Sequence, residues 1–325
     1  MKFSIIVVSL NPGEKLKKTL DSIFAQTYTD YEVVLKDGGS TDGSVDQGDG
    51  SFGTQKNTSP GQAEAAVHKC NPHRQSGAEY DGTFGRVRFF CEPDKGIYDA
   101  MNQAVSYAKG EYILFLNCGD LFADEKVLER TAAVIDGERA VQKSGAYKAQ
   151  KVGACETIES KEAGGKQERK ENLVLYGDTL SEKNSVVIAA PPEITGFTCY
   201  RNIPCHQSCF YSAVLCKEKP YELQYKIRAD YEHFLWCFYE AGAKMVYLDF
   251  PVAVYEGGGY SESKANLLRD KQEHKRITAT YIPKKELLKY KMIMALTLAP
   301  MRRKMAENKA FTGIYHWVKG KLYKK

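Results

Sequence analysis

The sequence lacks a long apolar run, and this absence argues against a protein that spans a membrane. Nowhere in its 325 residues do about 18 apolar residues follow one another without interruption, which is the length that a spanning helix needs. Hydrophobic residues make up 43% and charged residues 27% of the chain, proportions typical of soluble globular proteins. The apolar N-terminal segment is short and ends at Asn11-Pro12-Gly13, so we expect it to be a buried strand.

The cysteines lack a regular spacing. There are nine of them, an odd number, and they are scattered along the chain. Cys205 and Cys209 could form half of a metal site, but no second pair with matching spacing is present. We therefore expect free thiols in a reducing cytoplasm, and neither a disulfide framework nor a zinc site.

Two signatures of nucleotide-binding proteins are missing as well. The chain has no P-loop of the Walker type, and no G-x-G-x-x-G motif follows its first apolar segment. Each motif supplies the backbone N–H groups that hold phosphate in its own class of protein. The missing motifs argue against a kinase of the P-loop type and against a dinucleotide-dependent dehydrogenase.

Acidic residues are scarce in the C-terminal segment. Residues 284–325 carry twelve Lys or Arg against Glu286 and Glu307, within a chain whose net charge is +5. Leucines, methionines and aromatic residues lie among these cations. A basic segment with apolar and aromatic side chains suits an anionic membrane surface, although a solvated helix packed on the core would have a similar composition.

The chain does contain a strand–helix–strand pattern at its N-terminus. Residues 3–10 are apolar and β-branched, apolar residues recur with helical spacing within 15–26, and 31–35 form a second strand pattern. This order predicts a right-handed parallel crossover. Further strands are predicted at 87–91, 112–116, 173–176 and 243–248, and helices at 97–108, 127–135, 229–241, 261–281 and 284–298. We therefore predict an α/β protein with a Rossmann-like, mostly parallel sheet, helices on both faces and additional C-terminal helices.

Two segments interrupt this pattern. Residues 46–85 are rich in Gly, Gln, Ser and Asn, and residues 141–170 are polar and charged with little periodicity. We interpret the first as a long insertion or loop with a short helix near residues 63–67. Loops of this length inside a compact domain are uncommon and often functional.

Turn-forming polar residues follow three of the predicted strands. The segments are 37–43 (D-G-G-S-T-D-G), 92–96 (E-P-D-K-G) and 117–120 (N-C-G-D). Each alone could be an ordinary turn. Ligands of parallel α/β sheets bind at the carboxyl ends of the strands, so three acidic turns at three such ends favour a binding site. Asp120 offers a hard oxygen ligand for Mg²⁺ or Mn²⁺.

These motifs together resemble family 2 glycosyltransferases of the GT-A fold. The resemblance rests on 4–42, which includes S-I-I-V-V-S-L-N and Y-E-V-V-L-K-D-G-G-S-T-D, on 92–102 (E-P-D-K-G-I-Y-D-A-M-N), and on 110–120 (G-E-Y-I-L-F-L-N-C-G-D). It covers residues 3–125, apart from the insertion, and resumes near 205–208 and 227–231. It implies a GT-A domain at 1–282, with a nucleotide-binding half (1–125) and an acceptor half (170–282), followed by a basic amphipathic helical tail at 283–325.

The resemblance implies roles for individual residues. Asp37 is similar to the carboxylate that binds the nucleotide base, and Asp94 to a further nucleotide contact. His206 lies where a contact to phosphate or acceptor is expected. The complete expected nucleotide-sugar site comprises Ser9, Asp37, Gly39, Asp94, Lys95, Asn117 and His206.

The expected metal motif departs from the family pattern. Asn117-Cys118-Gly119-Asp120 occupies the place of the D-x-D motif, and Asn117 and Gly119 replace two acidic positions. Asp120 is therefore the expected ligand of Mg²⁺ or Mn²⁺, and the diphosphate could supply most of the remaining coordination.

Asp230, in Arg228-Ala229-Asp230-Tyr231, resembles the catalytic base of the family. An inverting transfer is a single displacement, in which a carboxylate takes the proton of the acceptor hydroxyl. A helix start favours the ionised carboxylate. An ordinary N-cap is the structural alternative.

The expected activity is that of an inverting hexosyl- or N-acetylhexosaminyltransferase. It would move a sugar from a UDP-sugar, or another nucleotide-diphosphate sugar, to a glycan or lipid-linked acceptor in bacterial cell-surface polysaccharide biosynthesis. The Q-x-x-R-W signature of processive polymerases is absent, so one sugar per encounter is expected. We expect a cytoplasmic protein, peripheral at the inner face of the membrane through its tail, without a nucleic-acid partner. Two alternatives remain: a sugar nucleotidyltransferase and a catalytically inactive nucleotide-binding module.

Overall fold

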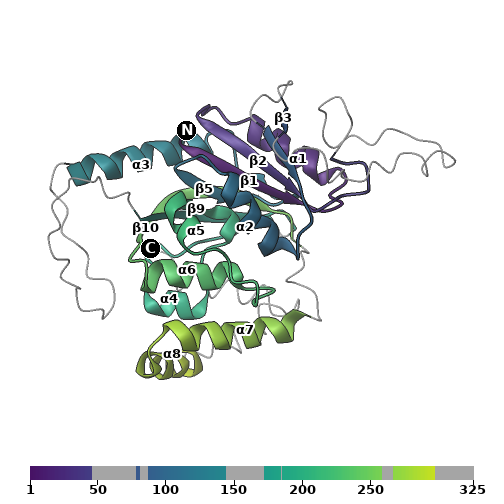
Figure 1. The fold of residues 1–325 in the computed structure, drawn as a ribbon. Coiled ribbons are helices and arrows are strands. Elements are labelled where there is room, and N and C mark those ends of the chain that lie inside the picture. Colours follow the sequence, from purple (N-terminus) through teal and green to yellow (C-terminus); the bar gives the residue numbers. More distant parts are fainter. Residues whose placement is uncertain (46–77, 81–86, 144–171, 184, 258–265, 297–325) are drawn as a thin grey trace, which may run out of the picture.

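The computed structural model describes residues 1–45, 78–80, 87–143, 172–183, 185–257 and 266–296. In this part of the chain, a single 10-stranded sheet runs through the molecule, with helices packed on both of its faces (Figure 1). The strand order is β3-β4-β2-β1-β5-β9-β7-β10-β6, and β8 pairs with β7. The predicted α/β class and its Rossmann-like sheet are confirmed.

Parallel strands make up the N-terminal half of the sheet. β1 pairs with β2 and with β5, and β2 pairs with β4, all in parallel register. Helices α1 and α2 provide the crossovers, as the strand–helix–strand pattern predicts. These elements are β1 (Phe3–Ser9), α1 (Lys15–Phe24), β2 (Tyr31–Asp37), β4 (Val87–Cys91), α2 (Ile97–Tyr107) and β5 (Tyr112–Phe115).

An antiparallel strand joins this half to the rest of the sheet. β9 (Cys209–Ser212) lies between β5 and β7 (Leu173–Ser181) and is antiparallel to both. β7 then pairs in parallel with the long strand β10 (Lys244–Tyr255). The sequence pattern did not predict β9, and it predicted shorter versions of β7 and β10. A four-residue strand is too short to give a periodic pattern.

Three short strands lie at the margins of the sheet. β6 (Leu121–Phe122) pairs with β10, and β8 (Val186–Ile188) pairs with β7. β3 (Ala78–Tyr80) pairs with β4 in antiparallel register. The expectation of a loop throughout residues 46–85 is therefore wrong at β3, because a partner strand can organise a segment that has no pattern of its own. The rest of that insertion, the short helix expected within it and residues 144–170 lie outside the described residues.

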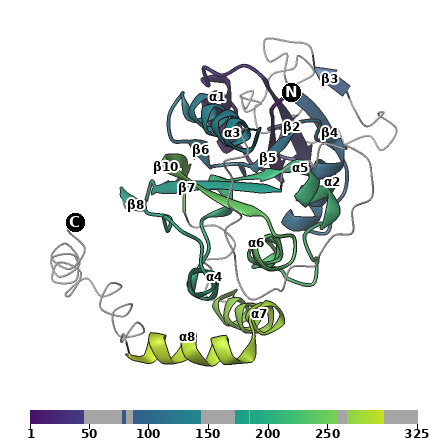
Figure 2. The same ribbon diagram turned by 90° about the vertical axis from the view of Figure 1, so that its left-hand side faces the viewer.

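Successive side chains of each strand point to opposite faces of the sheet, which creates two separate hydrophobic cores. In β1, Ile5 and Val7 face one core while Ile6 and Val8 face the other. The first core is closed by α1 and α3 (Val127–Lys143), and the second by α2, α5 (Ala213–Glu218) and α6 (Ala229–Tyr239). Figure 2 shows α1 and α3 on one side of the sheet and α6 on the other. Helix α3 extends beyond the predicted end at residue 135.

The C-terminal helices lie beneath the second core (Figures 1 and 2). α7 (Asn266–Tyr281) packs on α6, and α8 (Lys284–Leu296) packs on α7 and on α4 (Gly196–Arg201). Tyr290 of α8 is buried against Phe197 and Tyr200 of α4. The C-terminal helices that the sequence predicts are therefore present, and the remainder of the tail, residues 297–325, lies outside the described part.

Two expectations drawn from composition have different outcomes. Within the described residues, no helix combines the length and apolar character needed to cross a bilayer. The expectation of free thiols is wrong for Cys91, which forms a disulfide, because spacing along the chain does not reveal which sulfurs meet in space. The other cysteines in the described part of the chain are free thiols: Cys118, Cys199, Cys205, Cys209, Cys216 and Cys237.

Candidate active site

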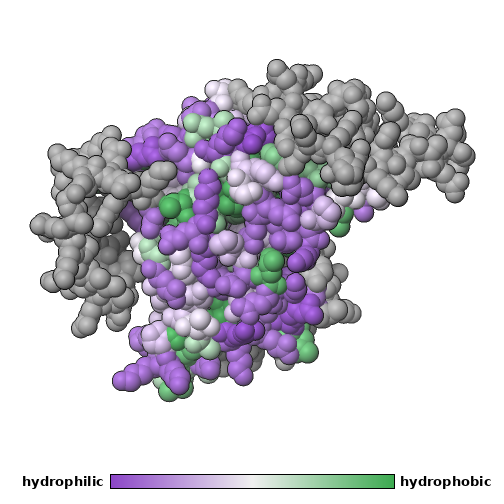
Figure 3. All heavy atoms as spheres, in the orientation of Figure 1, coloured by the Kyte–Doolittle hydropathy of each residue, from purple (hydrophilic) through white to green (hydrophobic). Residues whose placement is uncertain are grey.

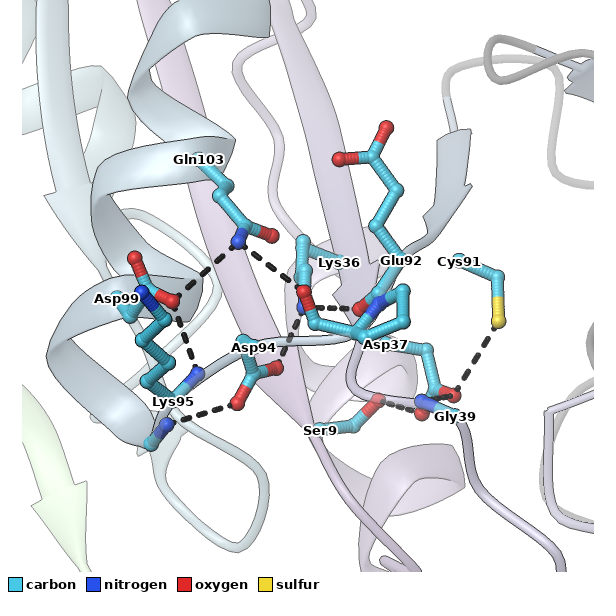
Figure 4. Close-up of polar contacts among 12 residues, drawn as sticks. Ser9, Lys36, Asp37, Gly39, Cys91, Glu92, Asp94, Lys95, Asp99 and Gln103 are labelled. Carbon is cyan, nitrogen blue, oxygen red and sulfur yellow. Dashed lines mark hydrogen bonds and ion pairs between the residues drawn. The ribbon is translucent and has the colours of Figure 1, made fainter. Parts of the chain in front are cut away.

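Asp37 organises the turn at the end of β2. Its Oδ1 accepts hydrogen bonds from the hydroxyls of Ser9 (2.8 Å) and Ser40 (2.6 Å), and its Oδ2 accepts from the backbone N–H groups of Gly39 (2.8 Å) and Ser40 (2.6 Å). The carboxylate is fully buried. Four donors occupy the acceptor positions of a carboxylate, so Asp37 fixes the backbone of this turn and ties it to β1 (Figure 4).

A buried ion pair holds the next turn. Lys36, fully buried at the end of β2, donates to the Glu92 carbonyl at 2.6 Å and to Asp94 Oδ2 at 2.5 Å. The other oxygen of Asp94 accepts the backbone N–H of Gly96 at 3.0 Å. A Cβ on Gly38 would stand 2.7 Å from Asp94 Oδ2. Glycine at position 38 therefore lets the two turns approach each other (Figure 4).

The third turn follows β5 and contains Asp120. Its shape is fixed by Thr19 of α1, whose hydroxyl accepts the Gly119 N–H and donates to the Asp120 carbonyl, both at 3.0 Å. Gly119 has φ 102°, and a Cβ there would lie 2.4 Å from Glu256 Oε2. An acidic side chain at position 119 would be strained by the positive φ and would require the Glu256 carboxylate to move aside. Glycine meets neither cost.

The Asp120 carboxylate has few contacts that would stabilise its negative charge. Its side chain is largely buried, and Oδ1 has a long contact of 3.4 Å to the backbone N–H of Glu256. Burial raises the pKa of Asp120 to about 6, with the electrostatic interaction with His206 acting in the opposite direction. Glu256 itself forms an ion pair with Lys15 at 2.7 Å. A cation beside Asp120 would stabilise its ionised form.

Asp230 lies on the first turn of α6 and is held by two side chains. Tyr98 of α2 places its hydroxyl 2.9 Å from Asp230 Oδ1, and His206 Nδ1 is 3.5 Å from Oδ2. Burial alone would raise the pKa of Asp230, but His206 and Tyr98 outweigh it and hold the pKa below its ordinary value. The N-cap of α6 is Arg228, so Asp230 is not the ordinary helix cap that its position in the sequence also allowed.

His206 connects Asp230 to the turn after β5. Its Nε2 lies 3.1 Å from Asn117 Nδ2. The antiparallel register of β5 and β9, in which Leu114 faces Phe210, brings residue 117 beside the short helix η1 (His206–Ser208). Burial alone would lower the pKa of His206, but its contact with Asp230 outweighs it and raises the pKa.

Helix α7 fixes the loop that leads to Asp230. Glu273, a buried residue of α7, accepts the backbone N–H groups of Lys226 (2.9 Å), Ile227 (3.0 Å) and Arg228 (3.0 Å). Arg228 also forms a two-pronged ion pair with Asp270 at 2.6 and 3.0 Å. Two carboxylates of one helix therefore set where α6 begins.

The predicted site residues gather at one edge of the sheet. Asp37 and Asp120 both act electrostatically on Cys118 and, after burial, raise its pKa; His206 faces Asp230 and interacts with Asp120. The Lys95 side chain is exposed, and its backbone N–H is bound to Asp99 at 2.8 Å. Sequence reasoning assigned no role to the supporting residues Lys36, Tyr98, Glu256 and Glu273. Lys36 and Tyr98 lie within the segments that carry the family resemblance, which was the available signal for them, whereas Glu256 and Glu273 lie outside those segments.

The donor set at Asp120 fits a hard cation that is completed by ligand oxygens. Asp120 offers a carboxylate, the ligand type that Mg²⁺ and Mn²⁺ prefer. Among the described residues, no group of three or more His, Cys, Asp or Glu could hold a metal ion. In the described part of the chain, the site therefore offers the single carboxylate of Asp120 and no complete set of metal ligands.

Solved structures with a similar fold place this architecture in a class. The chain resembles S. aureus TarS 1-349 in complex with UDP-GlcNAc, with a TM-score of 0.55 and 19% identity over 87% of this chain and 66% of that one. It also resembles the mannosyltransferase PcManGT of Pyrobaculum calidifontis in complex with GDP-Man and Mn²⁺, with a TM-score of 0.53 and 14% identity over 97% and 83% of the two chains. The chain spans less than two thirds of the TarS fragment. The fold is that of GT-A glycosyltransferases.

Sequence comparison then identifies the family. The family model described as glycosyl transferase family 2 matches residues 4–51 and 74–177. A PGL/p-HBAD biosynthesis glycosyltransferase of Mycobacterium tuberculosis is 30% identical over 277 residues, 85% of this chain and 83% of that protein. A second glycosyltransferase of the same organism is 25% identical over 237 residues, 71% of this chain and 67% of that protein. The chain belongs to glycosyltransferase family 2.

Proposed function

We propose that the chain is an inverting glycosyltransferase that moves one sugar from a UDP-sugar to an acceptor hydroxyl. The observation that carries the proposal is the placement of Asp230. Its carboxylate has a lowered pKa, is held by Tyr98 and His206, and lies at the sheet edge where the three polar turns meet. An oriented, ionised carboxylate beside a nucleotide site is what proton removal from an acceptor requires.

The donor nucleotide would rest on the first two turns. Asp37 and Asp94 would hold the nucleotide by fixing the backbone on which it lies, since their own oxygens are already hydrogen-bonded. Ser9 and Gly39 would border the same surface, and the exposed cation of Lys95 would face the anionic donor. The UDP-GlcNAc and GDP-Man complexes of the structural neighbours support a nucleotide sugar as the donor.

Asp120 would hold Mg²⁺ or Mn²⁺ together with oxygens of the diphosphate and water. Mg²⁺ commonly binds one or two carboxylates and substrate phosphates in this way, and the structure of the mannosyltransferase contains Mn²⁺. The metal would neutralise charge on the leaving diphosphate. The elevated pKa of Asp120, about 6, supports a site that gains from an added positive charge.

The reaction would be a single displacement. Asp230 takes the proton of the acceptor hydroxyl while that oxygen forms a bond to the anomeric carbon. The bond from this carbon to the diphosphate oxygen breaks, its electron pair leaves with UDP, and the configuration of the carbon inverts. The side chain of Asp230 must therefore reach the acceptor hydroxyl, and its carboxylate is about one-fifth exposed.

A hexose or N-acetylhexosamine is the proposed sugar, and a glycan or lipid-linked molecule is the proposed acceptor in bacterial cell-surface polysaccharide biosynthesis. The UDP-GlcNAc complex of TarS supports a sugar of this kind.

We further propose a cytoplasmic enzyme that contacts an anionic membrane surface through α8. Leu288, Met292 and Leu296 are exposed at four-residue intervals, and the same helix carries Lys284, Lys285, Lys289 and Lys291. Figure 3 shows apolar and hydrophilic surface alternating at the lower end of the molecule, where Figure 1 draws α8. Sedimentation with anionic vesicles that is absent with neutral vesicles would support this contact, and equal binding to both would contradict it.

Two parallel incubations, together with a donor-binding measurement, separate the proposed activity from its alternatives. The chain is supplied with UDP-sugars, Mn²⁺ and a lipid-linked glycan acceptor, and in parallel with nucleoside triphosphates and sugar 1-phosphates. Release of UDP with a glycosylated acceptor supports the transferase. Release of pyrophosphate would identify a nucleotidyltransferase, and donor binding without turnover would identify an inactive binding module.

A further inference from the structure

Both ring nitrogens of His206 are already occupied within the protein. Nε2 faces the amide nitrogen of Asn117 at 3.1 Å, and Nδ1 faces Asp230 Oδ2 at 3.5 Å. An amide nitrogen has only hydrogens to offer. With the amide in this orientation Nε2 accepts, which leaves the ring proton on Nδ1, where it points at the carboxylate. A ring arranged in this way has no nitrogen left for a phosphate or a sugar.

We propose that Asn117 sets the tautomer of His206, and that His206 in turn orients Asp230, so that Asn117 and His206 are positioning residues and not donor ligands. The proposal rests on the proposed function, in which Asp230 is the base. In this arrangement Asn117 donates to His206 Nε2, and the Nδ1 proton of His206 points at Asp230 Oδ2, 3.5 Å away. The base thus receives a proton donor at a fixed position while it remains free to accept a further proton.

The opposite oxygen of Asp230 is held independently. Tyr98 lies 2.9 Å from Oδ1, and its hydroxyl also contacts the carbonyl of Ile227 at 2.6 Å, in the loop just before α6. The carboxylate therefore has one neighbour from α2 and another from η1. Removing His206 would leave Oδ1 held but release Oδ2, and the carboxylate could then rotate about its own axis.

An asparagine is the residue type that this arrangement needs at position 117. A carboxylate there would draw a proton onto Nε2 and hold the ring as an imidazolium between two anions. The neutral amide can donate to Nε2 without adding charge. The Oδ1 of Asn117 is buried without a hydrogen-bond partner, which offers one competing arrangement: a rotated amide whose oxygen would accept from a protonated Nε2. The two arrangements differ in the protonation of the ring and can be told apart.

Nitrogen-15 NMR of the full chain, labelled at histidine, tests the tautomer without any substrate. The His206 signals are identified by their loss in His206→Gln. At pH 8, the proposal predicts a neutral ring with its proton on Nδ1 in the wild type. It predicts an imidazolium in Asn117→Asp and a mixture of tautomers in Asn117→Ala. Asn172→Ala, which removes an amide bound to the Ala241 carbonyl, serves as a matched control with unchanged signals. An imidazolium, or a proton on Nε2, in the wild type would overturn the proposal.

Kinetics then separate positioning from donor binding. Asn117→Ala and His206→Gln should lower kcat about tenfold or more, with little change in the donor KM, and the acid limb of the kcat profile should move to higher pH in His206→Gln. A raised donor KM with unchanged kcat would identify the two residues as donor ligands and contradict the proposal. Because the NMR result needs no turnover, a wild type that transfers no sugar would disprove the proposed function and leave the assignment of the tautomer standing.

Discussion

Glu273 accepts the backbone N–H of Arg228 at 3.0 Å, so a side chain of α7 fixes the residue at which the Asp230 helix begins. The same carboxylate also accepts the N–H groups of Lys226 and Ile227. A helix that lies far from the nucleotide turns in the sequence therefore determines the position of the proposed base.

Replacing Glu273 with Gln tests this relationship. The amide would place a donor against backbone N–H groups, and hydrogen bonds to charged groups contribute about 1.5–3 kcal/mol. We expect the free energy of unfolding to fall by about 2 kcal/mol and kcat to fall, while the Kd for the donor stays unchanged. Urea unfolding, calorimetry with UDP and turnover assays provide the three values. Glu240→Gln, an exposed change at the end of α6, is the control, and equal effects in both variants would refute the role of Glu273.

The buried pair of Lys36 and Asp94 gives a second prediction. Lys36 is fully buried and Asp94 nearly so, and removing one member of a buried pair typically costs about 3–5 kcal/mol. Lys36→Met should therefore destabilise the chain by about 3 kcal/mol and weaken UDP binding. Lys36→Met combined with Asp94→Leu should be less unstable than the sum of the two single variants. Additive losses in urea unfolding would mean that the two side chains are not coupled.

His233 predicts a dependence of stability on pH. This histidine is buried among the rings of Tyr211, Tyr221 and Trp236, and burial lowers its pKa to about 4. The pKa of His233 in the folded state lies below its value of about 6.5 in the unfolded state. The full free energy of unfolding is therefore present above pH 6.5, where the ring is neutral in both states, and part of it is lost as the pH falls towards 4. The loss is on the order of 3 kcal/mol at 1.36 kcal/mol per unit. In His233→Phe this part of the pH dependence should disappear from urea unfolding curves, and an unchanged slope would contradict the assignment.

The N-terminal half of the fold follows from local sequence patterns. Apolar runs and helical spacing within residues 3–45 and 87–116 predict β1, α1, β2, β4, α2 and β5, since each element buries a face that its own residues define. The polar turns at Asp37, Asp94 and Asp120 could be placed at the strand ends for the same reason. What the sequence could not indicate is that Asp37 and Asp94 use their own oxygens to build these turns.

The second half depends on contacts between distant segments. β9 is short, and its antiparallel pairing with β5 has no local signal, yet it brings His206 to Asn117. Glu273 binds the loop before Asp230 across a sequence separation of 45–47 residues. The sequence shows that Gly119 departs from the family motif. Only the structure shows that this residue has a positive φ and lies close to Glu256.

Asp230→Asn provides the most direct test of the proposed function. The isosteric amide retains the size of the side chain but cannot take a proton, and general base catalysis contributes about 10²–10⁴-fold. The donor Kd is measured by calorimetry and sugar transfer by UDP release, with the exposed change Asp249→Asn as control. The account predicts an unchanged donor Kd and a kcat at least about a hundredfold lower. Near-normal transfer by folded Asp230→Asn would contradict it.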